Sequence, residues 1–267
     1  MNIHDFISYK KRNQKISMIT CYDYTFAKII ENTPIHLILV GDSVAMTVHG
    51  YPNTLSATVE MMAMHTQAVA KGAPGKFIVG DLPFMSYRQG KKAAIKAVTK
   101  IMRAGASAIK LEGCEGNLEI IEHIVESGVP VMGHIGLMPQ SVFNLGGYKV
   151  QGKDEKSQQK LLEQALALEK AGCFSIVLEC VTEEVAQHIS KKLTIPTIGI
   201  GAGRHVDGQV LVLQDLLGLN TDFKPKFVKT YLTGEQLVNQ AICQYHEEVV
   251  EKVFPEPNNC FILKVAS

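Results

Sequence analysis

The sequence predicts a (β/α)8 barrel, the TIM-barrel class of α/β fold, with residues 1–267 forming a single domain. Eight short apolar segments, rich in β-branched residues, alternate along the chain with longer segments of helical periodicity. The length of 267 residues allows one large domain or two small ones, and α/β barrels commonly reach this length as one domain. The alternative is an open doubly wound sheet, and the count of eight strands favours the closed barrel.

The expected elements begin with a short polar helix in residues 1–15, which contain no apolar signal core. Helical periodicity covers 58–72, 91–105, 117–128 and 157–172, and most of these segments end at a glycine, a common helix stop. The expected strands are 15–21, 36–42, 76–82, 107–113, 130–137, 175–180, 197–203 and 209–215.

A last helix is expected from Thr233 to about Glu251, because Thr233 and Gln236 have the spacing of a capping box. The segment that follows, "FPEPNNCFILKVAS", contains two prolines and is expected to form an irregular tail.

The composition excludes several classes of function. There are 27 basic and 26 acidic residues, mixed along the chain, so no electrostatic footprint for nucleic acid or anionic membrane is present. No run of 18 apolar residues predicts a transmembrane helix. The six cysteines lack CxxC spacing, which indicates reduced thiols instead of a disulfide framework or a zinc site. We therefore expect a cytoplasmic protein.

Ionisable and polar side chains occur where five of the expected strands end. Active sites of barrels lie at the carboxyl ends of the strands, and an unpaired charge inside an apolar strand is costly, so the set predicts a site. For any single aspartate, an ordinary turn residue is the simpler interpretation. The residues are Asp42 and Ser43, Asp81, Lys110 and Glu112, His134, and Glu179.

Two of these strands end in the same Val-Gly-Asp, at Asp42 and Asp81. We expect both aspartates to point toward one bound group at the mouth of the barrel. Gly41 and Gly80 are expected to be positions where a larger side chain would crowd that mouth. Lys110 and Glu112 are two residues apart and therefore project to the same side of a strand. An internal salt bridge filling the barrel is the alternative explanation of that pair.

Asp42, Asp81 and Glu112 would repel one another unless a cation lies between them. All three are hard oxygen ligands, so Mg²⁺ is the expected ion. Such an ion binds an α-keto acid through its carboxylate and ketone oxygens, and Lys110 would complement the negative charge of that substrate. Glu179 is placed for general-base chemistry.

The sequence resembles the ketopantoate hydroxymethyltransferases, also called 3-methyl-2-oxobutanoate hydroxymethyltransferases, of the phosphoenolpyruvate/pyruvate barrel group. The resemblance extends from about residue 10 to 255. Met138 in "GLMPQS", where the family more usually has threonine, and the tail are its departures. The matching segments include "TCYDYTFAKI", "LVGDSVAMTVHGYPNTLSATVEMM", "GDLPFMSY", "MRAGASAIKLEG", "GVPVMGHIGLMPQS", "GGYKVQGK", "LEKAGCFSIVLECV" and "IPTIGIGAGRHVDGQVLVLQDLLGL".

The resemblance implies a transfer of a one-carbon unit from 5,10-methylenetetrahydrofolate to 3-methyl-2-oxobutanoate, giving 2-dehydropantoate and tetrahydrofolate in pantothenate and coenzyme A biosynthesis. It implies a homo-oligomer, a decamer in the family. By position, it assigns Mg²⁺ to Asp42, Asp81 and Glu112, and proton removal to Glu179. The implied keto-acid contacts are Asp42, Ser43, Asp81, Lys110 and His134.

Two other functions are alternatives to this one. A C–C or P–C lyase or mutase of the same barrel group would also use Mg²⁺ and an α-keto acid. Such enzymes rely on a loop nucleophile or cysteine motif, and Cys114 does not have the neighbours of one. A barrel that binds a keto acid or metal without turnover is the alternative from another class. The intact set of ionisable residues argues against it.

Overall fold

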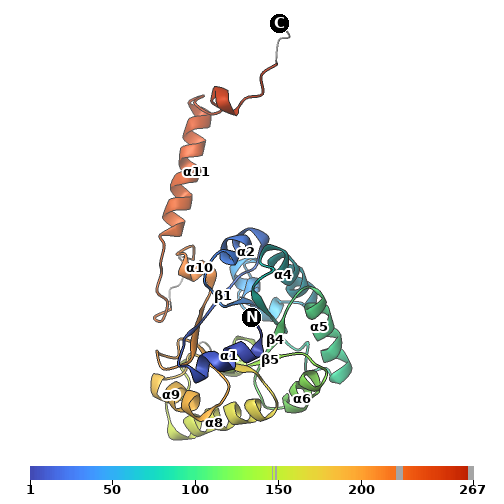
Figure 1. Cartoon of the computed structure of the whole chain (residues 1–267). Helices are drawn as coiled ribbons and strands as arrows, with labels where there is room; N and C mark the ends of the chain where they lie inside the picture. Colours follow the sequence, from blue (N-terminus) through green and yellow to red (C-terminus); the bar gives the residue numbers. More distant parts are fainter. Residues whose placement is uncertain (146, 148, 221–224, 264–267) are drawn as a thin grey trace. The chain divides into compact units, whose positions relative to one another are not determined.

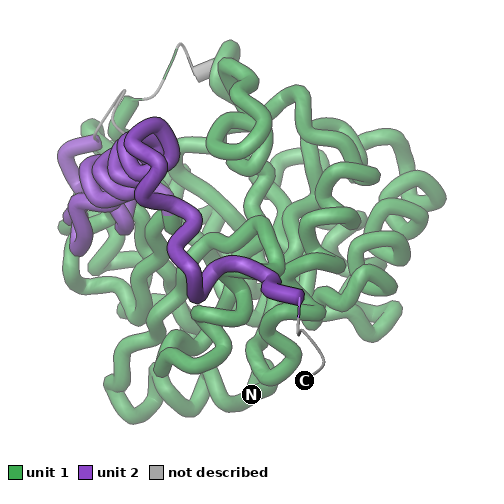
Figure 2. The backbone as a smooth tube through the Cα atoms, turned by 90° about the horizontal axis from the view of Figure 1, so that it is seen from above, with its two compact units in different colours: residues 1–213 green, residues 214–267 purple. Residues whose placement is uncertain are grey.

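The structure is a computed structural model that describes residues 1–145, 147, 149–220 and 225–263. The chain divides into two compact units, residues 1–213 and 214–267 (Figure 2). The expectation of one domain over 1–267 stays a prediction. No helix among the described residues is long and apolar enough to cross a membrane.

The first unit contains a closed barrel of eight parallel strands, which confirms the predicted fold class (Figure 1). Each strand pairs with the next in chain order, and β1 closes the barrel by pairing with β8, with Ile16 opposite Gly208. The strands are β1 (Ile16–Thr20), β2 (Leu37–Val40), β3 (Phe77–Asp81), β4 (Ala108–Glu112), β5 (Val131–Gly136), β6 (Ser175–Glu179), β7 (Thr197–Ile200) and β8 (Gly208–Leu211).

The eighth strand is shorter than predicted. We expected it to reach residue 215, but it ends at Leu211, and α10 (Leu213–Leu216) follows almost at once. The Leu213 amide donates a hydrogen bond to the Thr20 hydroxyl oxygen on β1, at 3.0 Å. The apolar run "VLVLQDL" therefore contains the end of a strand and the start of a helix, which periodicity alone does not separate.

Helices cover the outside of the barrel (Figure 1). They include α2 (Tyr24–Glu31), α4 (Val59–Gly72), α5 (Lys91–Arg103), α6 (Leu118–Glu126), α8 (Glu155–Lys170) and α9 (Glu183–Lys192). Side-chain caps fix several starts: Asp23 caps α2, and Thr58 and Asp154 cap α4 and α8. Short helices in the loops above the strands are α3 (Val44–Thr47), η1 (Thr54–Ser56), η2 (Pro139–Ser141) and α7 (Val142–Leu145).

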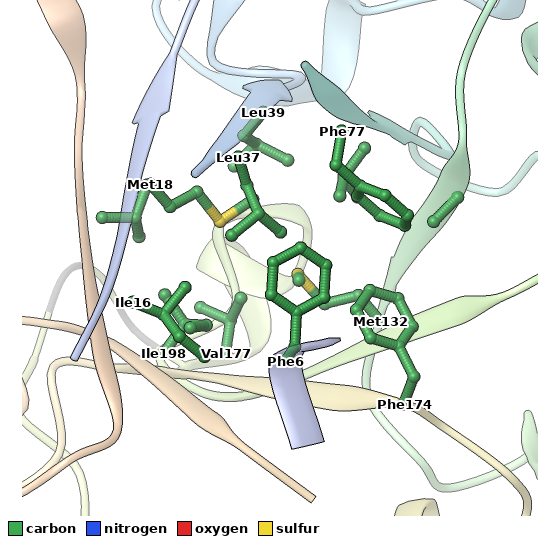
Figure 3. Close-up of a cluster of buried hydrophobic side chains, with 13 residues drawn as sticks. Phe6, Ile16, Met18, Leu37, Leu39, Phe77, Met132, Phe174, Val177 and Ile198 are labelled. Carbon is green, nitrogen blue, oxygen red and sulfur yellow. The ribbon is translucent and has the colours of Figure 1, made fainter. Parts of the chain in front are cut away.

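The amino-terminal helix α1 (Ile3–Lys11) closes one end of the barrel with an apolar side chain. Phe6 is 1% exposed and lies in a cluster of buried hydrophobic side chains with Ile16, Leu37, Phe77 and Phe174 (Figure 3). Its ring centroid is 5.1 Å from that of Phe77 and 6.2 Å from that of Phe174. This end is therefore filled with hydrocarbon, and polar chemistry is confined to the other end of the strands.

The second unit contains α11 (Gly234–Val250) and a tail in which η3 (Pro257–Asn259) is the short regular element described. The expected capping box at the start of α11 is wrong: the Thr233 side chain makes no cap hydrogen bond. Among the described residues of α11, only Gly234 is buried. All six cysteines are free thiols, as expected.

Candidate active site

All seven residues singled out at the strand ends line one pocket at the carboxyl ends of the strands. Five of them, Asp42, Asp81, Lys110, Glu112 and His134, are at most 4% exposed. The remaining walls of the pocket are mostly apolar and come from Leu39, Val177, Ile200, Val210 and Val212, with Met46. The pocket therefore combines a charged floor with hydrocarbon walls.

The two Val-Gly-Asp aspartates are in direct contact. The Asp42 amide donates a hydrogen bond to Asp81 Oδ2 at 3.0 Å, and Lys110 Nζ lies 2.9 Å from Asp81 Oδ1. Burial lowers the pKa of Lys110, but the charges of Asp81, Glu112 and Asp42 outweigh it and raise the pKa above its usual value. Lys110 is therefore a buried ammonium ion among carboxylates.

His134 connects the other two carboxylates of the pocket. Its Nδ1 is 3.5 Å from Glu112 Oε1, and its Nε2 is 3.2 Å from Glu179 Oε2. Burial and Lys110 lower the pKa of His134, but hydrogen bonds with Glu112 and Glu179 outweigh them and raise it to about 9. A protonated imidazole donates from both ring nitrogens, so His134 orients Glu179 relative to the charged floor.

The carboxylates of the floor carry more negative charge than the cations beside them neutralise. Burial, then the neighbouring Asp81 and Glu112, raise the pKa of Asp42 well above its ordinary range. Burial also raises the pKa of Asp81, although Lys110 opposes it. Glu112 Oε1 is buried, and its neighbour is the long His134 Nδ1 contact of 3.5 Å. A bound cation would supply the missing positive charge and a closer partner for this oxygen.

Among the residues that the structure describes, no three His, Cys, Asp or Glu side chains are already arranged as a metal-binding group. This differs from the predicted three-carboxylate site. Mg²⁺ typically keeps several waters and completes its coordination with oxygens of its substrate, so the carboxylates need not already converge on one point before the ion binds. The donor set fits such an ion without a closed protein cage.

Gly41 and Gly80 have different reasons to be glycine. A Cβ atom on Gly41 would lie 2.8 Å from Ser43 Oγ and 3.6 Å from Asp81 Oδ2, so it would crowd the pocket as expected. A Cβ atom on Gly80 would instead collide with Ile101 of α5, on the outside of the barrel. The expectation that a side chain at position 80 would crowd the pocket is therefore wrong. Successive residues of a strand face opposite sides of the sheet, and Gly80 faces away from the pocket.

Gln140 is a residue of the site that sequence reasoning missed. Its Nε2 donates to Asp42 Oδ2 at 2.8 Å and to the Leu82 carbonyl at 3.0 Å. Its backbone amide donates to Glu112 Oε2 at 3.0 Å, and its Oε1 accepts a hydrogen bond from the Tyr87 hydroxyl at 2.8 Å. Gln140 thus fixes one oxygen each of Asp42 and Glu112. Its place in "PQS", directly after the fifth strand, was the available signal.

Ser43 is held by a neighbouring tyrosine. Its Oγ lies 2.7 Å from the hydroxyl oxygen of Tyr22, which is 1% exposed. Burial raises the pKa of Tyr22 to about 12, so the phenol stays protonated. The serine hydroxyl is therefore pre-oriented at the edge of the pocket beside Asp42.

A closed (β/α)8 barrel with a buried acid–base cluster at the carboxyl ends of its strands has the architecture of a barrel enzyme. The chain belongs to the ketopantoate hydroxymethyltransferase family, whose model matches residues 1–257. It is 58% identical to the 3-methyl-2-oxobutanoate hydroxymethyltransferase of Bdellovibrio bacteriovorus over 97% of this chain and 98% of that protein. It is 54% identical to the enzyme of that name from Coxiella burnetii, over 96% of each chain.

Solved structures share the fold at low sequence identity. A phosphonopyruvate hydrolase in complex with oxalate and Mg²⁺ has a TM-score of 0.63 and 12% identity, covering 97% of this chain and 93% of that one. An oxaloacetate acetylhydrolase in complex with oxalate has a TM-score of 0.59 and 13% identity, covering 94% and 97%. At these identities the likeness is one of fold.

Proposed function

We propose that this protein is a 3-methyl-2-oxobutanoate hydroxymethyltransferase. In the proposed reaction a one-carbon unit from 5,10-methylenetetrahydrofolate, with water, is added to 3-methyl-2-oxobutanoate, and the products are 2-dehydropantoate and tetrahydrofolate. The family membership and the names of relatives more than 50% identical support the reaction. The observation that carries the proposal for the site is one pocket lined by Asp42, Ser43, Asp81, Lys110, Glu112, His134 and Glu179.

In this proposal Asp42, Asp81 and Glu112 hold a divalent cation, with Mg²⁺ as the expected ion. The raised pKa of Asp42 supports it, because burial first, and then the neighbouring Asp81 and Glu112, disfavour the ionised carboxylate when no further cation is beside it. When bound, the ion supplies Lewis-acid charge to the oxygens of the keto acid. Lys110 contributes a second positive charge from the floor, and Ser43 a hydroxyl at its edge.

Glu179 is the proposed base. The carbon to be alkylated is C3, next to the ketone, and its proton must leave before a new C–C bond forms. At 17% exposure the Glu179 side chain reaches the pocket from the end of β6, and His134 holds its Oε2 at 3.2 Å. Glu179 takes the C3 proton, and the electron pair left on C3 forms the bond to the methylene carbon of the folate. Both C–N bonds of that carbon break, and their electron pairs return to N5 and N10 of tetrahydrofolate. Water supplies the hydroxyl of the product, and its other proton, together with the proton taken from C3, ends on the two nitrogens.

The test is proton exchange at C3 of 3-methyl-2-oxobutanoate in deuterated water, with and without Mg²⁺, followed by addition of methylenetetrahydrofolate. Wild-type protein should exchange the proton when Mg²⁺ is present and form 2-dehydropantoate when the folate is added. Exchange without a folate-dependent product would favour another keto-acid chemistry. Neither exchange nor product would favour a barrel that only binds.

The variant Glu179→Gln separates binding from proton removal. It should bind the keto acid with Mg²⁺ within about threefold of wild type, since the side chain keeps its shape. Exchange at C3 should fall by about 10²- to 10⁴-fold, the usual contribution of a positioned base. Near-normal exchange in this variant would rule out Glu179 as the base.

We also propose that the protein forms a homo-oligomer, a decamer as the family resemblance implies, and functions in the cytoplasm. The apolar side chains exposed on α11 support assembly, since large exposed apolar patches are unusual in monomers. They are Leu237, Val238, Ile242, Tyr245, Val249 and Val250. The six free thiols support a reducing compartment. Light scattering coupled to gel filtration measures the subunit number.

A further inference from the structure

Thr54, at the start of η1, has a buried hydroxyl without a partner. The residue is 2% exposed, and its Oγ1 makes no hydrogen bond with the described residues. A buried polar group left unpaired costs about 1–3 kcal/mol. Such a cost is tolerated where a bound molecule completes the hydrogen bond, and unsatisfied groups of this kind call for an explanation.

The position of Thr54 supplies that explanation. Thr54 lines the same pocket as the carboxylates, Lys110 and His134. Its backbone is held in place on both sides: the Asn53 side chain accepts a hydrogen bond from the Leu55 amide, and the Thr54 carbonyl accepts one from Ala57 at 3.1 Å. The hydroxyl is therefore presented to the pocket by a fixed turn.

The partners of the other polar groups in the pocket show why the hydrogen-bond donor of Thr54 would matter for substrate binding. The carboxylates offer oxygen acceptors when ionised. The Lys110 ammonium is paired with Asp81, the imidazole of His134 lies between Glu112 and Glu179, and the Ser43 hydroxyl is bonded to Tyr22. An anionic keto acid brings a carboxylate and a ketone with several lone pairs into this pocket, so it can accept more than one hydrogen bond, and the Thr54 hydroxyl is a donor with no competing partner among the described residues.

We propose that the Thr54 hydroxyl donates a hydrogen bond to an oxygen of the bound 2-keto acid, which makes Thr54 a substrate-binding residue. The assignment rests on the proposed function, because that function supplies the anion. Isopropyl carbons of the substrate then face the apolar walls.

The variant Thr54→Val tests the proposal, since valine has nearly the shape of threonine without the hydroxyl. We expect the affinity for 3-methyl-2-oxobutanoate, measured by calorimetry with saturating Mg²⁺, to fall by about 10- to 100-fold, as expected for a hydrogen bond to a charged group. The melting temperature of the ligand-free protein should stay unchanged or rise. Thr54→Ser, which keeps a hydroxyl, should bind within about threefold of wild type.

The matched control is Thr66→Val. Thr66 on α4 is 0% exposed and also has a hydroxyl without a partner among the described residues, but it does not line the pocket. This variant should change the melting temperature in the same direction as Thr54→Val and leave keto-acid affinity unaltered. An equal loss of affinity in both variants would mean that the effect comes from the barrel as a whole, and would overturn the proposal.

Three further results would overturn it. Wild-type affinity in Thr54→Val would show that the hydroxyl does not contact the substrate. An equal weakening of Mg²⁺ binding without keto acid would assign the hydroxyl to metal-bound water instead. If wild-type protein itself bound no 3-methyl-2-oxobutanoate, the proposed function would fail, and the assignment of Thr54 would fail with it. The wild-type measurement thus distinguishes the two failures.

Discussion

Replacing Gln140 by leucine should damage both the stability of the barrel and its affinity for a divalent ion. Leucine fills nearly the same volume, so the change is chiefly the loss of hydrogen bonds. Asp42 Oδ2 loses a donor at 2.8 Å, and the Leu82 carbonyl loses one at 3.0 Å. A hydrogen bond to a charged group contributes about 1.5–3 kcal/mol, and an unpaired buried carbonyl costs about 1–3 kcal/mol. The free energy of unfolding should therefore fall by about 3–5 kcal/mol.

The affinity for Mn²⁺, used as a calorimetric substitute for Mg²⁺, should fall by about 10- to 100-fold, because residues that orient metal ligands typically contribute that much. Urea denaturation of the metal-free protein measures the stability. The control is Tyr87→Phe, which leaves both Nε2 donors of Gln140 in place and should cost about 1 kcal/mol. If Gln140→Leu lost less than about 1 kcal/mol and bound Mn²⁺ like wild type, the positioning argument would be wrong.

Two other perturbations test the charges of the barrel. Lys110→Met removes the cation beside Asp81, which should lower the free energy of unfolding of the metal-free protein by about 3–5 kcal/mol. Added Mg²⁺ should restore part of that loss. An unchanged stability in urea would contradict a stabilising ion pair between Lys110 and Asp81. His36 is a pH test: burial, then Lys76, lower its pKa, and its Nδ1 accepts the Ser17 amide at 3.0 Å. Because the pKa of His36 is lower in the folded chain, the unfolded chain binds a proton on this imidazole more readily. The contribution of His36 to the free energy of unfolding is therefore present above its ordinary pKa and is lost as the pH falls below that value. The urea midpoint should thus drop between pH 7 and 5 more in wild type than in His36→Asn, and equal drops would refute the assignment.

The strands and the charged floor could be predicted from the sequence because both leave one-dimensional signals. An apolar run that stops at a charged residue marks a buried strand that ends at a site, and β2 with Asp42 and β6 with Glu179 follow this pattern. The end of β8 could not be placed this way, since the helix that follows is equally apolar. Element boundaries depend on hydrogen bonds between distant residues, such as that from Leu213 to Thr20.

The supporting residues of the site were harder to find than the charged ones. Gln140 and Thr54 are neutral residues in loops, where glutamine and threonine are ordinary. What distinguishes them is burial against residues far away in sequence: Gln140 contacts Asp42, and Thr54 lines the same pocket as Glu179. Such relations exist only once the barrel has closed, so no local pattern records them.

The packing of Phe6 has a consequence for the order in which the barrel is completed during synthesis. Phe6 leaves the ribosome before two of its aromatic neighbours, Phe77 and Phe174, and the latter arrives only as β6 is made. At about 5–20 residues per second the first helix waits many seconds for that neighbour. The pairing of Ile16 with Gly208 comes later still. Until β6 is made, the nascent chain therefore carries Phe6 without its full set of aromatic neighbours, a period in which a chaperone that binds apolar segments has a target.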